Sequence, residues 1–291
     1  MNSKLAIGTV QFGMPYGVSN ETGQVDSREV ENIICLARES GIDTLDTAIS
    51  YGNCEEILGC QSLDGMSIIT KLPEAPLNCN NLKSWMHSRI EESLCRLNVS
   101  SLDAVLLHKP NQLLGSSGTK LYNALNSLKE AGLVNRIGIS IYTADELEVY
   151  CKKFKYDLIQ APFSIFDRRL VETGWLERLY EQGTNVHVRS IFLQGLLLMT
   201  KEMRPAKFNR WNSVWNCWDN WLIETKQRPL DACLRYVLSS QEIEKVVVGI
   251  SSSKDLKEIL DSPVQDELFE FPEGLSNIDN DLLNPSNWEN L

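Results

Sequence analysis

The sequence predicts an α/β protein, a (β/α)8 TIM barrel whose sheet is parallel, eight-stranded and closed. Three observations support this fold class. Short apolar runs alternate with longer stretches of helical period from one end of the chain to the other. There are eight such runs, and no Pro/Ser-rich linker interrupts them. Because eight alternating strand and helix units fit one closed barrel, residues 1–291 are expected to form a single domain.

Each expected strand is a short apolar run, and together they occupy residues 5–8, 42–46, 67–71, 103–108, 136–140, 157–160, 186–190 and 245–249. Residues 26–41 and 80–97 carry apolar side chains every three or four positions, which is typical of amphipathic helices. Gly41 and Gly132 stand where helix C-caps are expected. The alternative fold is an open doubly wound sheet, which usually has a GxGxxG turn after its first strand. Here that turn reads GTVQFG, so the barrel is favoured.

Two segments interrupt the alternation. Residues 198–222 form a predicted loop insertion that holds Trp211, Trp215, Trp218 and Trp221 at helical spacing. These tryptophans either pack a short extra helix on the barrel rim or form a wall for the substrate. The tail from about residue 262 is polar with scattered apolar residues, and we expect it to lie over the barrel as a loop.

Composition excludes several classes of partner. The formal net charge of −11, without a block of basic residues, argues against nucleic acids and anionic membrane surfaces. No segment approaches the roughly eighteen apolar residues of a membrane span, and the N-terminus does not resemble a secretion signal. The 8 cysteines include no CxxC pair and the 3 histidines lack zinc-ligand spacing. We therefore expect reduced thiols, no metal site and a cytoplasmic location.

Polar side chains at the ends of the predicted strands indicate a site. Asp46, Lys71 and His108 end three consecutive strands, and Tyr51 follows in the loop after the second. Loops at these ends build the active sites of barrels. A phenol with a pKa of about 10 needs a nearby cation to act as an acid, and a buried lysine needs a nearby anion. Lys71 and Asp46 would meet these needs, while His108 would orient a substrate carbonyl.

Taken singly, each of these residues has a structural interpretation. Asp46 can cap a turn, Lys71 can extend its ammonium to solvent, and His108 can be a satisfied core residue. Four compatible groups at consecutive strand ends favour a single proton-handling site instead.

The segment GIDTLDTAISYGNCEEILG resembles the signature of the aldo-keto reductases, and IITKLP, LLHKP, GLVNRIGIS and DLIQAPFSIFDRR follow at suitable distances. The resemblance extends from about residue 5 to 260. It implies an aldo-keto reductase-like barrel domain that carries out an NAD(P)H-dependent carbonyl reduction. The family's catalytic tyrosine, lysine, aspartate and histidine match Tyr51, Lys71, Asp46 and His108.

The resemblance also implies a cofactor site, with NADP(H) as the family's usual cofactor and NAD(H) as the alternative. Ser140 and Gln160 match the positions that hold the nicotinamide carboxamide, and residues 190–198 match the pyrophosphate loop, in which Gly195 would allow close approach. The expected cofactor-binding residues are Gly8, Thr9, Asp46, Ser140, Gln160, Arg189, Ser190, Gly195, Gly249, Ser251, Asp255 and Glu258. A small carbonyl compound is the implied substrate, and the family leaves both monomer and homodimer open.

The chain departs from the family pattern at both ends of the expected cofactor. At the nicotinamide end, Ile141 replaces the usual asparagine and Arg189 stands where an aromatic residue is common. A guanidinium can also lie flat on a ring, or it can bind an anionic or sugar-like substrate.

At the adenosine end, serines 251 and 252 replace the Lys or Arg of many relatives, and Ile259 replaces an asparagine. Lys254 is the one cation of this loop, and Asp255 and Glu258 add negative charge. Serines 251–253 either bind an anion at the start of a helix or merely cap it. We expect weak discrimination between NADPH and NADH.

Two classes of function remain open at this stage. One is an enzyme that transfers hydride between a nicotinamide and a carbonyl or alcohol, with Tyr51 moving the proton. The other is a regulatory or sensor protein that binds NAD(P)H and turns over little substrate; the intact set of four residues argues against it. A metal-dependent hydrolase is disfavoured, because it needs clustered ligands at the strand ends.

Overall fold

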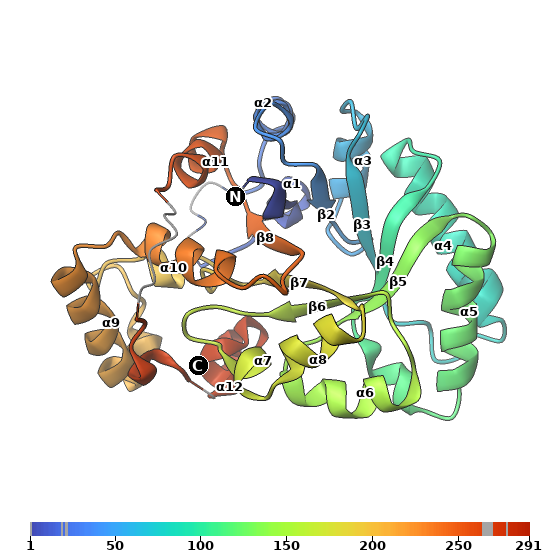
Figure 1. Cartoon of the computed structure of the whole chain (residues 1–291). Coiled ribbons are helices and arrows are strands. Elements are labelled where there is room, and N and C mark those ends of the chain that lie inside the picture. Colours follow the sequence, from blue (N-terminus) through green and yellow to red (C-terminus); the bar gives the residue numbers. More distant parts are fainter. Residues whose placement is uncertain (1, 19, 21–22, 264–269, 278) are drawn as a thin grey trace.

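The computed structural model describes residues 2–18, 20, 23–263, 270–277 and 279–291, and Figure 1 shows strands enclosed by helices. In this part of the chain, eight parallel strands pair in sequence order and β8 closes onto β1. The predicted barrel is therefore confirmed. The strands are β1 (Leu5–Gly8), β2 (Thr44–Asp46), β3 (Ser67–Leu72), β4 (Leu102–Leu107), β5 (Val134–Ser140), β6 (Leu158–Pro162), β7 (Asn185–Arg189) and β8 (Lys245–Gly249).

Helices follow most of the strands and cover the outside of the barrel (Figure 1). Local signals set several of their ends: the Asp26 carboxylate accepts from two backbone N–H groups at the start of α2, and Gly41 and Gly132 adopt φ of +79° and +70° beyond α2 and α5. The α-helices are α1 (Val10–Gly13), α2 (Ser27–Glu39), α3 (Cys54–Gly59), α4 (Leu82–Leu97), α5 (Gly118–Glu130), α6 (Leu147–Lys153), α7 (Arg169–Glu172), α8 (Trp175–Glu181), α9 (Asn212–Thr225), α10 (Pro229–Leu238), α11 (Ser253–Leu260) and α12 (Asn280–Leu283). Short 3-10 helices are η1 (Asn2–Lys4), η2 (Pro110–Leu114), η3 (Ala144–Glu146), η4 (Leu196–Leu198), η5 (Ala206–Trp211), η6 (Glu273–Leu275) and η7 (Pro285–Asn290).

A small apolar cluster lies on the same strand faces as the polar residues at the barrel mouth. Its members are Ile69, Ala104, Leu106 and Leu158, which are fully buried. Side chains two residues apart on a strand share a face, so Lys71, His108 and Gln160 each follow a member of this cluster on its own face. The apolar layer closes the barrel from below and leaves the polar groups at the carboxyl ends of the strands.

The insertion at 198–222 and the tail pack together rather than forming loops. Trp211, Trp215, Trp218 and Trp221 are 0–8% exposed and lie on η5 and α9. They form a second apolar core with tail residues that include Leu275, Leu282, Leu283 and Trp288. Of the two interpretations of these tryptophans, the packed extra helix is the one that α9 supports.

The expectation that the tail forms a loop is wrong for the described part of the tail, because this part contains η6, α12 and η7. Its scattered apolar residues have little helical period of their own, but they fold against the tryptophan face. The part of this expectation that concerns residues 264–269 lies outside the described residues.

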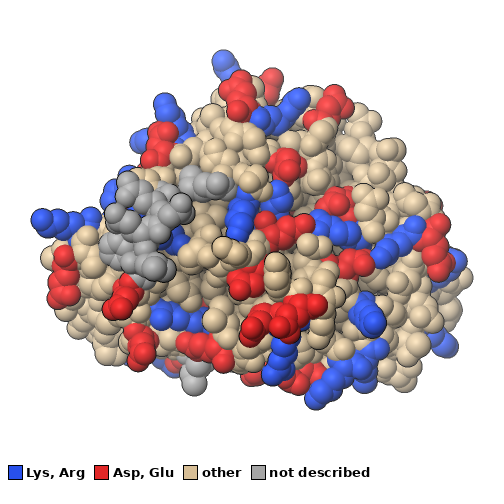
Figure 2. Space-filling view, in the orientation of Figure 1, with Lys and Arg blue, Asp and Glu red and all other residues tan. Residues whose placement is uncertain are grey.

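The described surface has a mixed character. On the face shown in Figure 2, basic and acidic side chains are interspersed, and neither sign forms a continuous field. No helix of the described chain combines the length and apolarity needed to cross a membrane. All 8 cysteines are free thiols.

An ionic network links β4, β5 and β7 to the residue before β8. Arg136 donates to the carboxylates of Glu244 and Asp103 at 2.8 and 2.5 Å, and His187 Nε2 lies 2.7 Å from Glu244 Oε2. Burial acts to raise the pKa of Glu244, but hydrogen bonds with His187 and Arg136 lower it from 4.5 to about 2. The network therefore holds a charged carboxylate between strands that are distant in sequence.

We expect Glu244→Gln to destabilise the barrel in a pH-dependent way. A folded-state pKa below the unfolded one stabilises the fold above pH 4.5, and this contribution is lost as the pH falls toward about 2. The loss of unfolding free energy caused by the substitution should therefore be largest at pH 7 and shrink below pH 4.5. Urea unfolding at pH 7 and about pH 3.5 measures it, with the nearby Glu242→Gln as control. An equal loss at both pH values would contradict this account.

Candidate active site

One cavity of about 1330 Å³ opens at the carboxyl ends of the strands. It is lined by every residue that the sequence singled out for catalysis or cofactor binding. Its walls also include side chains that were not predicted, among them Gln11, Tyr16, Tyr142, Arg228 and Trp288. The fold thus brings the proposed chemistry together in one place.

At the floor of the cavity, Lys71 and Asp46 form a buried ion pair. Lys71 Nζ donates to Asp46 Oδ1 at 2.5 Å and to the Thr47 carbonyl at 2.9 Å, and the side chains are 1% and 5% exposed. Gln160 Nε2 donates to the other oxygen of Asp46 at 2.6 Å. Burial acts to lower the pKa of Lys71, but Asp46 and Tyr51 hold it above its ordinary value. Lys71 is therefore charged at neutral pH, as the sequence predicted.

Tyr51 lies beside this charge, with Lys71 Nζ 5.3 Å from the centroid of its ring. Lys71 acts to lower the pKa of the phenol, in the predicted direction. Burial is the larger effect, however, and raises the pKa of Tyr51 above 10.0. The phenol is neutral at physiological pH, so it is available as a proton donor, and the lysine charge is placed to stabilise the phenolate.

His108 is a neutral imidazole next to the phenol. Its ring meets that of Tyr51 edge-on, with centroids 5.8 Å apart. Burial and the charges of Lys71 and Arg189 lower the pKa of His108 to about 4. Its Nδ1 lies 3.1 Å from the Ser50 hydroxyl, a contact that the sequence did not reveal. A neutral histidine keeps one N–H donor for a substrate oxygen.

Ser140 and Gln160 occupy paired positions on β5 and β6 at the cavity wall. Gln160 is fully buried, and while its amide nitrogen binds Asp46, its Oε1 has no hydrogen-bond partner within the described chain. A buried acceptor without a partner is costly, so a ligand N–H at this point would be favourable. The carboxamide of a nicotinamide provides such a donor, and these residues therefore fit the group.

Arg189 is not a free guanidinium. It lies 5.0 Å from the centroid of the Tyr142 ring and donates to the Ile141 carbonyl at 2.9 Å and to Ser190 Oγ at 3.2 Å. Tyr142, from the loop after β5, therefore brings an aromatic ring to the cavity wall beside Arg189. Nothing in a loop sequence of this kind marks Tyr142 as a pocket residue.

Two glycines in the cavity wall occupy positions where a side chain would be strained or crowded. Gly195 has a φ of +89°, in the left-handed region that favours glycine, within the expected pyrophosphate loop. A Cβ on Gly249 would lie 2.8 Å from Gln11 Nε2. Gln11 Oε1 is buried without a partner among the described residues, so Gln11 is a further polar group at the cavity wall.

Of the three serines after β8 (Ser251, Ser252 and Ser253), two are hydrogen-bonded within the protein. Ser252 caps α11 by accepting from the backbone N–H of Asp255 at 3.1 Å, and Ser253 binds Glu29. Ser251 lines the cavity, whereas Lys254 is exposed and is not part of the lining. The capping interpretation therefore accounts for Ser252, while Ser253 donates to the Glu29 carboxylate of α2.

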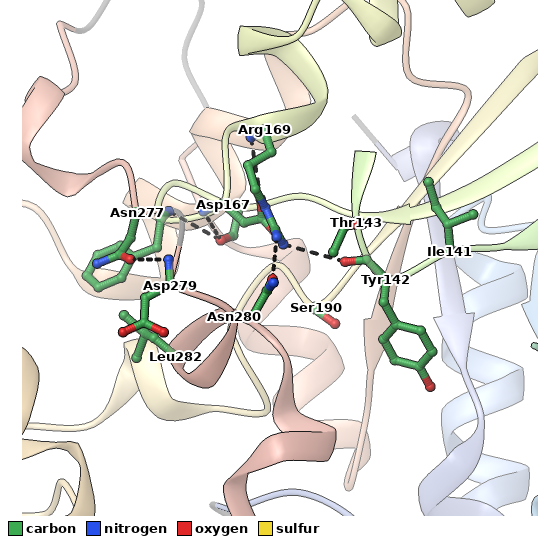
Figure 3. A network of polar contacts seen from close by, with 12 residues as sticks. Ile141, Tyr142, Thr143, Asp167, Arg169, Ser190, Asn277, Asp279, Asn280 and Leu282 are labelled. Atoms are coloured by element: carbon green, nitrogen blue, oxygen red, sulfur yellow. Dashed lines mark hydrogen bonds and ion pairs between the residues drawn. The ribbon is translucent and has the colours of Figure 1, made fainter. Parts of the chain in front are cut away.

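Figure 3 shows how the tail is attached beside the site. Arg169 pairs with both oxygens of Asp167, at 2.7 and 2.6 Å, and donates to Asn280 Oδ1 at 2.6 Å and weakly to the Tyr142 carbonyl at 3.5 Å. The backbone N–H of Asn277 donates to the carbonyl of Phe166, at 2.9 Å. This places tail residues 284–286, 288 and 289 in the cavity wall.

The closed barrel and the polar cavity at the carboxyl ends of its strands place the chain in the class of (β/α)8-barrel enzymes. A model of the Aldo/keto reductase family matches residues 4–268, and the chain belongs to that family. The family consists of NAD(P)-dependent oxidoreductases.

The chain is similar to individual members of the family. It is 26% identical to the NADH-specific methylglyoxal reductase of Escherichia coli, over 88% of each chain. It is 25% identical to an uncharacterized oxidoreductase, YqkF, of Bacillus subtilis, over 78% of this chain and 79% of that protein. Among solved structures, the holo form of the aldo-keto reductase AKR11C1 from Bacillus halodurans has a TM-score of 0.71 at 22% identity and covers 91% of this chain and 88% of its own. This last likeness concerns the fold.

We expect Arg169→Ala to loosen the tail. The substitution removes charge-assisted hydrogen bonds to the tail and the neighbouring loops, and losing about 1.4 kcal/mol of local stability makes an opening equilibrium tenfold more favourable. Amides of residues 273–277 and 279–291 should exchange with deuterium at least about tenfold faster, while the strands keep their protection. Arg178→Ala on α8 is the matched control, because Arg178 pairs with Glu148 instead. Unchanged protection of the tail would refute the anchoring role of Arg169.

Proposed function

We propose that the protein is an NAD(P)H-dependent reductase that converts an aldehyde or ketone to an alcohol, with Tyr51 as the proton donor. One observation carries the proposal: a neutral phenol faces the cavity 5.3 Å from a buried, charged lysine. A donor of this kind can release its proton when negative charge develops on a substrate oxygen, because the lysine stabilises the phenolate.

The four residues have separate roles in this mechanism. When bound, the reduced nicotinamide supplies a hydride for the carbonyl carbon. His108 donates a hydrogen bond to the substrate oxygen and orients it, and Tyr51 transfers its phenolic proton to that oxygen. Lys71 stabilises the tyrosinate that remains, and Asp46 keeps Lys71 charged within the barrel. In the oxidation of an alcohol, each proton movement is reversed.

Gln160 and Ser140 would hold the carboxamide of the nicotinamide, and the cavity continues past Gly195 to Ser251 and Ser252. The family's usual NADP(H) and the alternative NAD(H) both fit this path. The E. coli relative is named for its NADH specificity. We propose that dissociation constants for NADPH and NADH differ by less than about a hundredfold, or about 2.7 kcal/mol, because serines bind a phosphate less strongly than Arg or Lys.

For the substrate we propose a small, hydroxyl-bearing carbonyl compound. One part of the cavity wall combines Trp288 with the polar side chains of Lys207, Asn284, Ser286 and Glu289. An aromatic surface with several hydrogen-bonding groups suits a sugar-like molecule. The E. coli relative is named as a reductase of methylglyoxal, itself a small carbonyl compound. The free thiols also support the proposed cytoplasmic location.

Tyr51→Phe tests the proton donor. The variant loses only a hydroxyl, so cofactor affinity, followed by fluorescence titration, should survive. Single-turnover reduction of any carbonyl active with the parent should fall by at least about a hundredfold, the lower end of what a positioned acid contributes. Tyr16→Phe is the matched control, because Tyr16 lines the same cavity and its hydroxyl binds Gln194. Hydride transfer at the parental rate in Tyr51→Phe would show that another group is the acid.

Lys71→Met tests the source of the positive charge. Turnover should fall by several orders of magnitude, roughly the range lost when general acid catalysis fails. Because the single variant leaves the Asp46 carboxylate buried without its counterion, the double variant Asp46→Asn/Lys71→Met is measured beside it, with circular dichroism to verify folding. Activity within about threefold of the parent in a folded variant would rule out this role of Lys71.

A further inference from the structure

We propose that Glu29 is a specificity-determining residue that makes the adenosine end of the cavity favour NAD(H) over NADP(H). The inference rests on the proposed function, in which this cavity holds a nicotinamide dinucleotide. It adds to the expected weak discrimination between NADPH and NADH by stating which cofactor is favoured and which residue causes the preference. Glu29 lies on α2, far in sequence from the loop after β8, and nothing in the local sequence pattern marks it.

The Glu29 carboxylate lies at the start of α11. Its Oε1 accepts from the backbone N–H of Ser253 at 2.5 Å and from the Ser253 hydroxyl at 2.7 Å. Its Oε2 accepts from Asn32 at 2.9 Å. Free N–H groups at a helix N-terminus are natural partners for a phosphate, but here the protein's own carboxylate has taken them.

Glu29 carries its negative charge at neutral pH. Hydrogen bonds from Asn32 and Ser253 hold the pKa of its carboxyl below the ordinary 4.5. A 2′-phosphate that approached the N-terminus of α11 would therefore meet both an occupied N–H group and a like charge. A ribose 2′-hydroxyl is neutral and can itself donate a hydrogen bond to a carboxylate, so it meets neither obstacle.

The surrounding charges reinforce this preference. Asp255 and Glu258 line the cavity and are exposed, whereas Glu29 lies outside the lining and binds Ser253, the neighbour of the lining residue Ser252. Arg228 is the cation in the lining here, but it binds both oxygens of Asp231, at 2.6 and 2.7 Å, and lies 3.5 Å from Glu258. Lys254, in the same loop, is exposed and is not part of the lining. Carboxylates thus outnumber available cations where the extra phosphate would lie.

A purely structural role for Glu29 would be to join α2 to α11, which pack against each other. Cofactor discrimination separates the two roles. A structural link affects both cofactors alike through stability, whereas a like charge affects only the cofactor that carries the 2′-phosphate.

The test compares Glu29→Gln with the parent in fluorescence titrations of NADH and NADPH, independently of turnover. The parent should bind NADH more tightly, by about threefold to a hundredfold. Glutamine still offers an oxygen to Ser253 but no charge, so the variant should bind NADPH about tenfold more tightly and NADH within about threefold of the parent. The matched control is Glu31→Gln, which removes the same charge from an exposed position on α2. This control should leave the ratio of affinities unchanged.

Asp255→Asn is the second variant, because Asp255 is exposed and its removal does not disturb the α2–α11 contact. It should shift the ratio of affinities toward NADPH to a smaller extent. If both cofactors bind and the ratio stays the same in Glu29→Gln, or if the parent favours NADPH, this inference is wrong while the proposed reductase stands. If neither cofactor binds the parent, the proposed function fails and the inference fails with it.

Discussion

A charged lysine that is 1% exposed needs its counterion inside the protein, and Asp46 supplies it at 2.5 Å. This need for a counterion determines how the neighbouring side chains of the site are arranged. Asp46 has a second oxygen to satisfy, which fixes the Gln160 amide and leaves Gln160 Oε1 for a ligand. Lys71 also donates to the Thr47 carbonyl, and its Nζ lies over the Tyr51 ring, 5.3 Å from the centroid. Since buried charges without partners are strongly destabilising, this pair holds the ends of β2, β3 and β6 in one geometry.

The barrel and its mouth were predictable because their determinants are local. Strands β1 and β8 match their predicted bounds, and the other strands differ by a few residues. One difference is at β2, which begins at Thr44 rather than Ile42, because the Ile42 N–H bonds back to the carbonyl of Ala37 near the end of α2. Because the strands are parallel, Asp46, Lys71 and His108, which stand at the carboxyl ends of their strands, lie at the same end of the barrel.

The remaining features depend on contacts that the sequence does not display. Glu29 and Ser253 meet across 224 residues, and Asn280 reaches Arg169 from 111 residues away. The tail lacks a helical period, so its short helices depend on the tryptophan face of α9, which exists only after folding. The sequence also gives no sign of how deeply Tyr51 is buried. Burial raises the pKa of the phenol more than the charge of Lys71 lowers it.

The cavity lining draws on distant parts of the chain, including residues within 249–259 after β8 and residues within 284–289 of the tail. Among the described residues, the tail stretch makes no hydrogen bond to the barrel sheet, and Lys207 holds it by donating to the Trp288 carbonyl at 2.7 Å. Substitutions in the tail can therefore reshape this part of the cavity wall without moving the strands that carry Asp46 and Lys71. Among related barrels, the wall can diverge while the buried ion pair at the floor of the cavity stays the same.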